Sequence, residues 1–178
     1  MSNNFLISGK PGSGKTTLVT KVVAALDTAG FKAGGFVTEE IKEGSTRVGF
    51  AVRDLKGDEA VLAHMNYKGK PRVGKYGVDL NAFEEIALAA LRLGRDEADF
   101  LVADEIGRME IKSDTFRATV LEVMNSVLPL LATIPEAGDE FISDLKRRDD
   151  IEVYIINTRN RDELEGVIYE AMREKLSC

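Results

Sequence analysis

The stretch GKPGSGKTTL, residues 9–18, limits most strongly what this chain can fold into. Glycines and a proline stand directly before a lysine and two threonines. Glycine inside a regular element costs backbone entropy, and lysine is rarely buried without a partner, so a packed core cannot use this run. The preceding residues FLIS, 5–8, predict a short buried strand, and apolar positions over 15–29 recur at helical spacing before Gly30. The run therefore predicts a turn from a buried strand into an amphipathic helix.

This turn fits the pattern G-x-x-x-x-G-K-[ST] at every fixed position, in the strand–turn–helix context that the pattern requires. Its glycines let backbone N–H groups point at a bound anion, and the helix that follows adds the positive end of its dipole. Lys15 is expected to reach the β- and γ-phosphates, and the Thr16 hydroxyl to bind Mg²⁺. The predicted nucleotide-binding residues of this P-loop are Gly9, Lys10, Pro11, Gly12, Ser13, Gly14, Lys15, Thr16 and Thr17.

A second apolar strand, FLVADE at residues 100–105, ends in two acidic residues. Asp104 is expected to hold Mg²⁺ directly or through water, although a solvated acidic pair is also common at such a strand end. Glu105 is placed to orient and deprotonate an attacking water, which favours a hydrolase. P-loop proteins with such a glutamate tend to insert a further strand between the P-loop strand and the aspartate strand. Thr133, in LLATIP, is either the polar sensor on that strand or an ordinary β-branched strand residue.

The rest of the chain alternates apolar runs with helical patterns. Buried strands are predicted over residues 100–105, 127–134 (starting late, because of Pro129) and 151–157, and helices over 80–94 (closed by Gly94), 113–125, 138–147 and 160–176. Strands that are apolar throughout and separated by helices indicate a parallel sheet covered on both faces. Between them, β-rich runs over 33–65 are separated by the turn signals KEGS and KGD, and 66–77 reads as a polar, glycine-rich loop.

The predicted fold class is therefore α/β: a P-loop fold with a mostly parallel sheet, helices on both faces and an antiparallel β-meander extension. A chain of 178 residues is expected to form one domain, 1–178, with the meander inserted at about residues 33–77. The net charge of -6 argues against a general nucleic-acid binder, because phosphate affinity needs a basic surface. The single cysteine, Cys178, excludes an internal disulfide, and the single histidine, His64, makes a histidine-based metal site or a Ser-His-Asp triad an unfavourable interpretation.

The N-terminus lacks the pattern of a signal peptide, and no apolar run approaches the length of a membrane span, so a soluble cytoplasmic protein is expected. The sequence does not indicate a protein partner.

The match extends beyond the P-loop: GKPGSGKTTL is followed, in this order, by GGFVTEEI, RVGFAV, RVGKYGVDL, DEIGRME and NRDEL. Together they resemble the THEP family of nucleoside-triphosphatases over nearly the whole chain. The resemblance implies a RecA-like α/β fold and hydrolysis of ATP, GTP and other nucleotides to the diphosphate and phosphate. It also implies phosphate and Mg²⁺ binding by residues 9–17, Mg²⁺ binding by Asp104 and water activation by Glu105. Arg108 stands where the family leads us to expect lysine, which retains the charge and permits a bidentate phosphate contact.

Arginines are the candidates for contacting the base and for neutralising the charge of the transition state. No Asn-Lys-x-Asp run that would read guanine is present, and Arg159 or Arg161, after the last strand, could stack on a base. Asn160 with Glu163 reads alternatively as a helix capping box. A base that is stacked but not read predicts loose specificity. For the charge on the γ-phosphoryl group, Arg108 is the first candidate, Arg72 the second and Arg47 the third, each alternatively a solvated surface arginine.

Two other functions stay open from the sequence. A P-loop kinase of a small metabolite or nucleotide would suit the length and the P-loop, although Glu105 favours water as the acceptor. A nucleotide-dependent switch acting through a partner would use slow hydrolysis as a timer.

Overall fold

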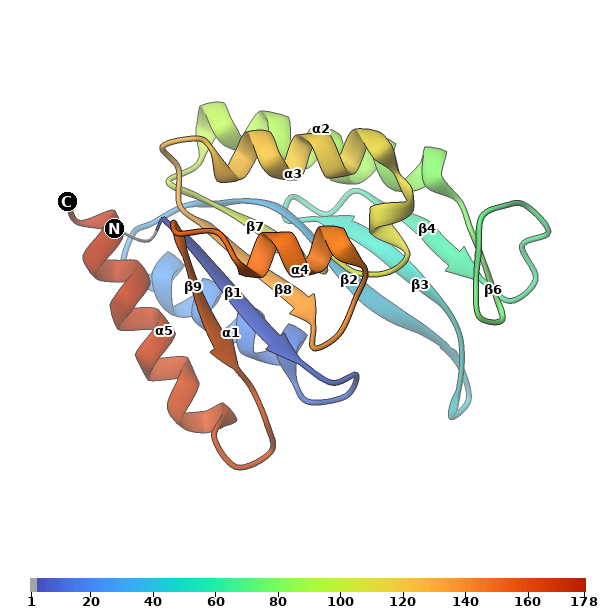
Figure 1. Cartoon of the computed structure of the whole chain (residues 1–178), viewed down its shortest axis with the longest axis horizontal. Coiled ribbons are helices and arrows are strands. Elements are labelled where there is room, and N and C mark those ends of the chain that lie inside the picture. Colours follow the sequence, from blue (N-terminus) through green and yellow to red (C-terminus); the bar gives the residue numbers. More distant parts are fainter. Residues whose placement is uncertain (1–2) are drawn as a thin grey trace.

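The structure, a computed structural model, describes residues 3–178, and it contains a nine-stranded sheet in the order β5-β6-β4-β3-β2-β7-β8-β1-β9 (Figure 1). The strands β2, β7, β8, β1 and β9 pair in parallel. Their bounds are β1 Asn4–Gly9, β2 Ala33–Glu43, β7 Phe100–Asp104, β8 Leu130–Pro135 and β9 Ile151–Ile155. As the sequence predicts, β8 is inserted between the P-loop strand and the strand that ends in Asp104, and it begins just after Pro129.

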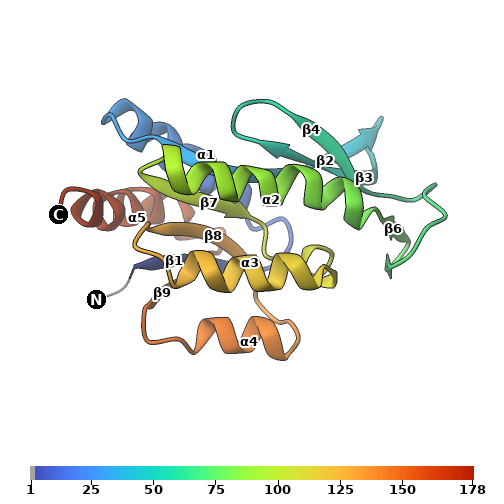
Figure 2. The same ribbon diagram turned by 90° about the horizontal axis from the view of Figure 1, so that it is seen from above.

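Helices cover both faces of the parallel strands, which explains why β1 and β7 are buried at every position (Figure 2). One face packs against α1 and α5, and the other against α2, α3 and α4. On the second face the rings of Phe36, Phe83 and Phe116 meet edge to face, with centroids 5.0–5.8 Å apart. The helix bounds are α1 Lys15–Thr28, α2 Leu80–Glu97, α3 Asp114–Met124, α4 Glu140–Lys146 and α5 Arg161–Leu176. The predicted fold class is confirmed.

The predicted antiparallel extension is present, built from β2 with β3 (Thr46–Asp54) and β4 (Glu59–His64). Beyond the pair Val37–Asp104, β2 leaves β7 and continues with β3 as a hairpin that projects past the carboxyl ends of the parallel strands (Figure 1). The loop predicted over residues 66–77 is partly wrong. Its second half forms a short hairpin of β5 (Arg72–Val73) and β6 (Tyr76–Val78), because β4 offers a free edge to β6.

Gly94 does not close a helix as predicted. The helix α2 continues to Glu97, and Gly94 is buried inside it, directly against the backbone of Gly34 in β2. The absence of a side chain at both positions lets the helix lie close to the strand. Gly30, by contrast, does stand after the end of α1, with a positive φ of 95°.

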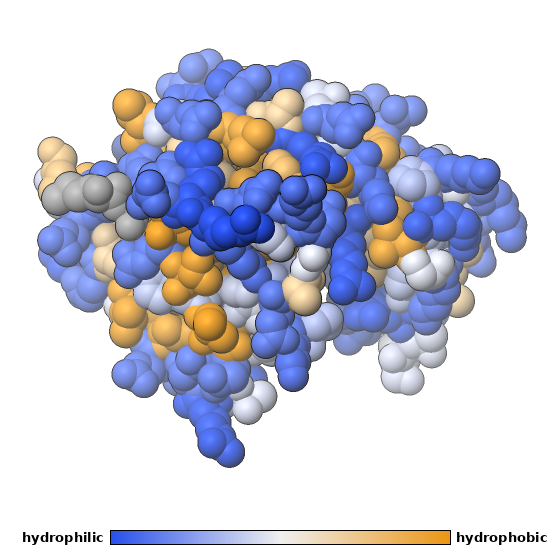
Figure 3. Space-filling view, viewed as in Figure 1, coloured by the Kyte–Doolittle hydropathy of each residue, from blue (hydrophilic) through white to orange (hydrophobic). Residues whose placement is uncertain are grey.

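The edge strand β9 carries the exposed apolar residues Val153 and Ile155, and Figure 3 shows apolar side chains gathered over this part of the molecule. Among residues 3–178, no helix combines the length and the apolar character that crossing a bilayer demands.

Candidate functional site

The P-loop has the geometry of an anion site. It leaves β1 at Gly9 and enters α1 at Lys15, and Gly12 and Gly14 take positive φ angles of 76° and 99°. No side chain caps the amino end of α1, and its first turn holds no acidic residue. The N–H groups of this turn are therefore available to a ligand, and the helix dipole favours an anion.

Lys15 joins the P-loop to the end of β7. Its side chain is buried, its Nζ donates a hydrogen bond to the Gly9 carbonyl at 2.8 Å, and it lies 3.1 Å from Glu105 Oε2. The peptide bond that links Asp104 to Glu105 is cis. The two predicted catalytic residues, 90 positions apart in the sequence, thus form an ion pair at the carboxyl edge of the sheet.

Asp104 is buried beside this pair. Its Oδ1 accepts a hydrogen bond of 2.6 Å from Thr133 Oγ1, and its Oδ2 has no hydrogen-bond partner. Burial raises the pKa of Asp104 to about 6, against the opposite effect of the nearby hydroxyl groups of Thr133 and Thr16. The unsatisfied Asp104 Oδ2 and the nearby Thr16 hydroxyl are oxygen ligands, the kind that Mg²⁺ prefers. Thr133, the residue left open by the sequence, is the buried partner of the predicted magnesium ligand.

Glu110 belongs to the same cluster, and sequence reasoning assigned it no role. It lies in a 3-10 turn, Glu110–Lys112, and its side chain is buried. Burial, followed by the charge of Glu105, raises its pKa to about 8. Its position in the segment DEIGRME was the available signal, but only the fold reveals that it is buried.

The three candidate arginines differ in their surroundings. Arg47 is held by Glu40, Tyr76 and the ring of Phe50, and Arg72 donates to two backbone carbonyls of its own loop. Arg108 is exposed at the carboxyl edge of the sheet and forms no hydrogen bond or ion pair with residues 3–178. Its guanidinium group is therefore the one of the three that is not already engaged.

Arg161 lies next to the P-loop, with its Cδ 3.8 Å from the position that a Cβ on Gly14 would take. It lines a cleft of about 280 Å³ together with Gly14, Thr17, Leu18, Lys21 and Asp162. Arg159 does not line this cleft. The capping box is not formed, because the Asn160 side chain bonds the backbone of Ile155 and Asn157 instead.

Lys146 is a second lysine near the P-loop that the sequence did not reveal. Its Nζ donates to Ser8 Oγ at 3.0 Å and to the carbonyls of Pro135 and Glu136 at 2.7 and 2.8 Å. Burial and the nearby charge of Lys15 lower its pKa. All three of its protons are engaged, so Lys146 ties the ends of β1 and β8 together beneath the P-loop.

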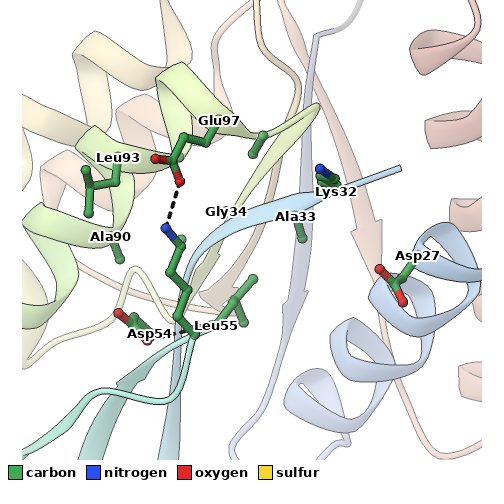
Figure 4. A pocket seen from close by; sticks show the side chains of 13 residues that line it. Asp27, Lys32, Ala33, Gly34, Asp54, Leu55, Ala90, Leu93 and Glu97 are labelled. Atoms are coloured by element: carbon green, nitrogen blue, oxygen red, sulfur yellow. Dashed lines mark hydrogen bonds and ion pairs between the residues drawn. The ribbon is translucent and has the colours of Figure 1, made fainter. Parts of the chain in front are cut away.

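A larger cleft, of about 590 Å³, opens at the amino ends of the parallel strands, where β2 begins. Glu97, labelled in Figure 4, lines this cleft and pairs with Lys56, whose Nζ lies 2.7 Å from Glu97 Oε2. The cleft includes none of the predicted site residues. The phosphate-binding geometry, rather than cleft size, therefore locates the candidate site. Among residues 3–178, no three His, Cys, Asp or Glu side chains gather as a metal site would require.

Comparisons with known proteins point to one family. The family described as NTPase matches residues 4–169. A protein of Thermotoga maritima named nucleoside-triphosphatase THEP1 is 39% identical over 169 residues, 95% of each chain. One of the same name from Thermofilum pendens is 42% identical over 90% of each chain.

Two solved structures share the fold. THEP1 from Aquifex aeolicus has a TM-score of 0.85 at 33% identity, and the match covers 93% of this chain and 96% of that one. A human cancer-related nucleoside triphosphatase has a TM-score of 0.82 at 31% identity, and the match covers 97% and 98% of the two chains.

Proposed function

This chain belongs to the NTPase family and is a nucleoside-triphosphatase, and we propose that it hydrolyses the β–γ anhydride of ATP, GTP and other nucleoside triphosphates with Mg²⁺ and a water activated by Glu105. The observation that carries the proposal is the cluster at the carboxyl edge of the sheet. It brings the P-loop Lys15 within 3.1 Å of Glu105, beside the buried Asp104.

In the proposed reaction Lys15 and the N–H groups of the P-loop bind the triphosphate, and Glu105 accepts a proton from a water molecule. The water oxygen forms a bond to the γ-phosphorus while the bond from that phosphorus to the β–γ bridging oxygen breaks. The products are the nucleoside diphosphate and phosphate. Asp104 and Thr16 would hold Mg²⁺, which supplies charge neutralisation to the phosphate oxygens. Arg108 would neutralise further charge in the transition state, since it is unengaged and follows Glu105 by three residues.

We place the base in the cleft beside Gly14, where the Arg161 guanidinium can stack on its face. Stacking serves every base, so the efficiencies for ATP and GTP should lie within about tenfold of each other. A preference above a thousandfold would reveal a base-specific contact.

The decisive test compares the Glu105→Gln variant with the wild type in nucleotide affinity and single-turnover hydrolysis. Glutamine keeps the shape and loses the base, so Mg²⁺-nucleotide should bind normally while turnover falls at least roughly tenfold. Lys15→Ala should lose tight triphosphate binding altogether. Unchanged turnover in Glu105→Gln would assign the water to another group.

The same assay separates hydrolysis from the two other functions. Phosphate release is measured on ATP, GTP, CTP and UTP, with and without small hydroxyl acceptors. Release that needs no acceptor supports the hydrolase, and a phosphorylated acceptor would indicate a kinase. A protein that co-purifies only in the presence of nucleotide would indicate a switch.

A further inference from the structure

Glu110 is a buried carboxyl group next to the catalytic cluster, and the proposed reaction does not use it. Its side chain is only 5% exposed. It lies in the 3-10 turn that follows β7, and backbone N–H groups of Gly107 and of Glu110 itself face its carboxyl group. No Lys, Arg or His among residues 3–178 forms an ion pair with it. An ionised carboxyl group is costly to bury without a cation, so such a group favours its neutral form.

Gly107 separates Glu110 from Glu105. A Cβ at Gly107 would lie 2.6 Å from Glu105 Oε1 and 2.9 Å from Glu110 Oε2. The two carboxyl groups therefore flank the same backbone position, and any side chain at residue 107 would displace one of them. Because residue 107 is glycine, both carboxyl oxygens can lie within 2.9 Å of the position that its Cβ would take.

The two oxygens of Glu105 consequently face different groups. Oε2 lies 3.1 Å from Lys15 Nζ, toward the P-loop, and Oε1 lies beside Gly107, the glycine that Glu110 Oε2 also adjoins. One oxygen is thus available on the side where the triphosphate binds, and the other is turned into the protein. Whatever holds the inner oxygen fixes the direction of the outer one.

We propose that Glu110 is a positioning residue for hydrolysis. Its protonated carboxyl group holds Glu105 Oε1, and this orients Glu105 Oε2 toward the attacking water. The inference rests on the proposed role of Glu105. A neutral carboxyl can donate a hydrogen bond to Glu105, whereas an ionised one would repel it. A displacement of about 1 Å in such a group costs up to about a hundredfold in rate.

The charged groups around Glu110 favour its neutral form. Burial raises the pKa of Glu110 to about 8. The charges of Glu105 and of Asp104, the last residue of β7, contribute to this shift. The helix α2, which packs on this turn, contributes Glu84, which accepts a hydrogen bond from Ser113 Oγ at 2.5 Å. Lys112, in the turn itself, is exposed, as is Asp114 at the start of α3. The two charges that most shift the pKa of Glu110, those of Glu105 and Asp104, are both acidic.

The test measures nucleotide affinity and single-turnover hydrolysis of Mg²⁺-ATP from pH 6 to 9.5 for Glu110→Gln, Glu110→Ala and the wild type. Glutamine imitates the neutral carboxyl group, so Glu110→Gln should retain the wild-type rate at pH 7 within about threefold. Alanine removes the support, so Glu110→Ala should lose about tenfold or more in turnover with little change in affinity. Glu85→Gln, an exposed acid on α2, is the matched control and should match the wild type.

The pH profile distinguishes positioning from mere packing. In the wild type, turnover should fall as pH rises through about 8, because an ionised Glu110 repels Glu105. In Glu110→Gln this alkaline fall should disappear, and packing alone would not remove it. An alkaline fall that persists in Glu110→Gln, or wild-type turnover in folded Glu110→Ala, would overturn the inference. If Glu105→Gln also turned over normally, the proposed role of Glu105 in activating water would fail. If only the Glu110 variants were unaffected, the inference alone would fail.

Discussion

At the scale of single residues, the site depends on how each charged group is satisfied. Lys15 has two partners and Asp104 Oδ1 has one, while Asp104 Oδ2 and the Arg108 guanidinium have none among residues 3–178. The unsatisfied groups are the ones that a nucleotide and its metal ion would engage. Groups that already have partners stabilise the site, whereas groups without partners are available to bind the substrate.

Thr133 is expected to matter through its hydroxyl group rather than its bulk. Thr133→Val keeps the volume and leaves Asp104 with no hydrogen bond from β8, so turnover should fall by about tenfold or more. Losing this bond also raises the pKa of Asp104 further, because the bond lowers it. The acidic limb of activity should therefore move to higher pH. Thr133→Ser keeps the hydroxyl and serves as the control in the same steady-state assay, and equal loss in both variants would contradict this explanation.

Arg108→Ala should lower turnover by about tenfold or more while nucleotide affinity changes little, which is the behaviour of a contact made only in the transition state. Single-turnover kinetics and equilibrium binding of the same protein check both halves. Arg92→Ala, another exposed arginine, on α2, is the control. If Arg108→Ala retains both values, Arg72 and Arg47 become the next candidates, although each must first leave the partners that hold it.

At the scale of elements, two helical glycines that look alike in the sequence have opposite surroundings. A Cβ at Gly94 would lie 2.5 Å from Leu101 Cδ2 and 3.1 Å from the Gly34 backbone, whereas a Cβ at Gly166 in α5 would meet nothing within 4 Å. Both substitutions to alanine gain about 1 kcal/mol of helix propensity. Gly166→Ala should therefore raise the thermal midpoint. Gly94→Ala should lower it, since overpacking costs about 1–3 kcal/mol. A stabilised Gly94→Ala protein would mean that α2 shifts away from β2 freely.

The sequence predicts some elements much better than others. Parallel strands buried on both faces read as unbroken apolar runs, so β1, β7 and β8 are visible without a structure. The mostly apolar β9 is visible too, although its edge position leaves Val153 and Ile155 exposed. The strands β5 and β6 have two and three residues, too few to show a period, so the sequence predicts a loop there. Gly94 was read as a helix end because a close approach of α2 to Gly34 leaves no local signal.

At the scale of the whole molecule, the buried acids should make the metal-free protein sensitive to pH. The folded protein keeps a proton on Glu110 up to about pH 8, whereas the unfolded chain releases it near the usual pKa of 4.5. Folded molecules bind more protons in this window, so stability falls as pH rises through it. Glu110→Gln should remove this dependence and be more stable than the wild type at pH 7 by roughly 1–3 kcal/mol. Thermal melts from pH 4.5 to 8 check it, and parallel curves would contradict it.

The site residues that cannot be recognised in the sequence are those whose roles depend on tertiary contacts. The P-loop, Asp104 and Glu105 are recognisable because their chemistry depends on neighbours in the sequence. Lys146 reaches Ser8 from 138 positions away, and Glu110 acquires its burial from packing around the loop after β7. A lysine or glutamate of this kind reads as a surface residue until the tertiary contacts are known.

The position of β8 in the sheet has a consequence for the order in which the segments of the site are completed during translation. The P-loop is complete once α1 has emerged, and Glu105 follows, but the strand that lies between them ends only at Pro135. Before that strand exists β1 has no partner, because its other neighbour, β9, is later still. Pairs such as Asn4 with Leu130 close long loops, and contacts of this kind form slowly. A nascent chain therefore carries its phosphate-binding sequence through most of translation with nothing to complete it, and hydrolysis becomes possible only when the protein is nearly finished.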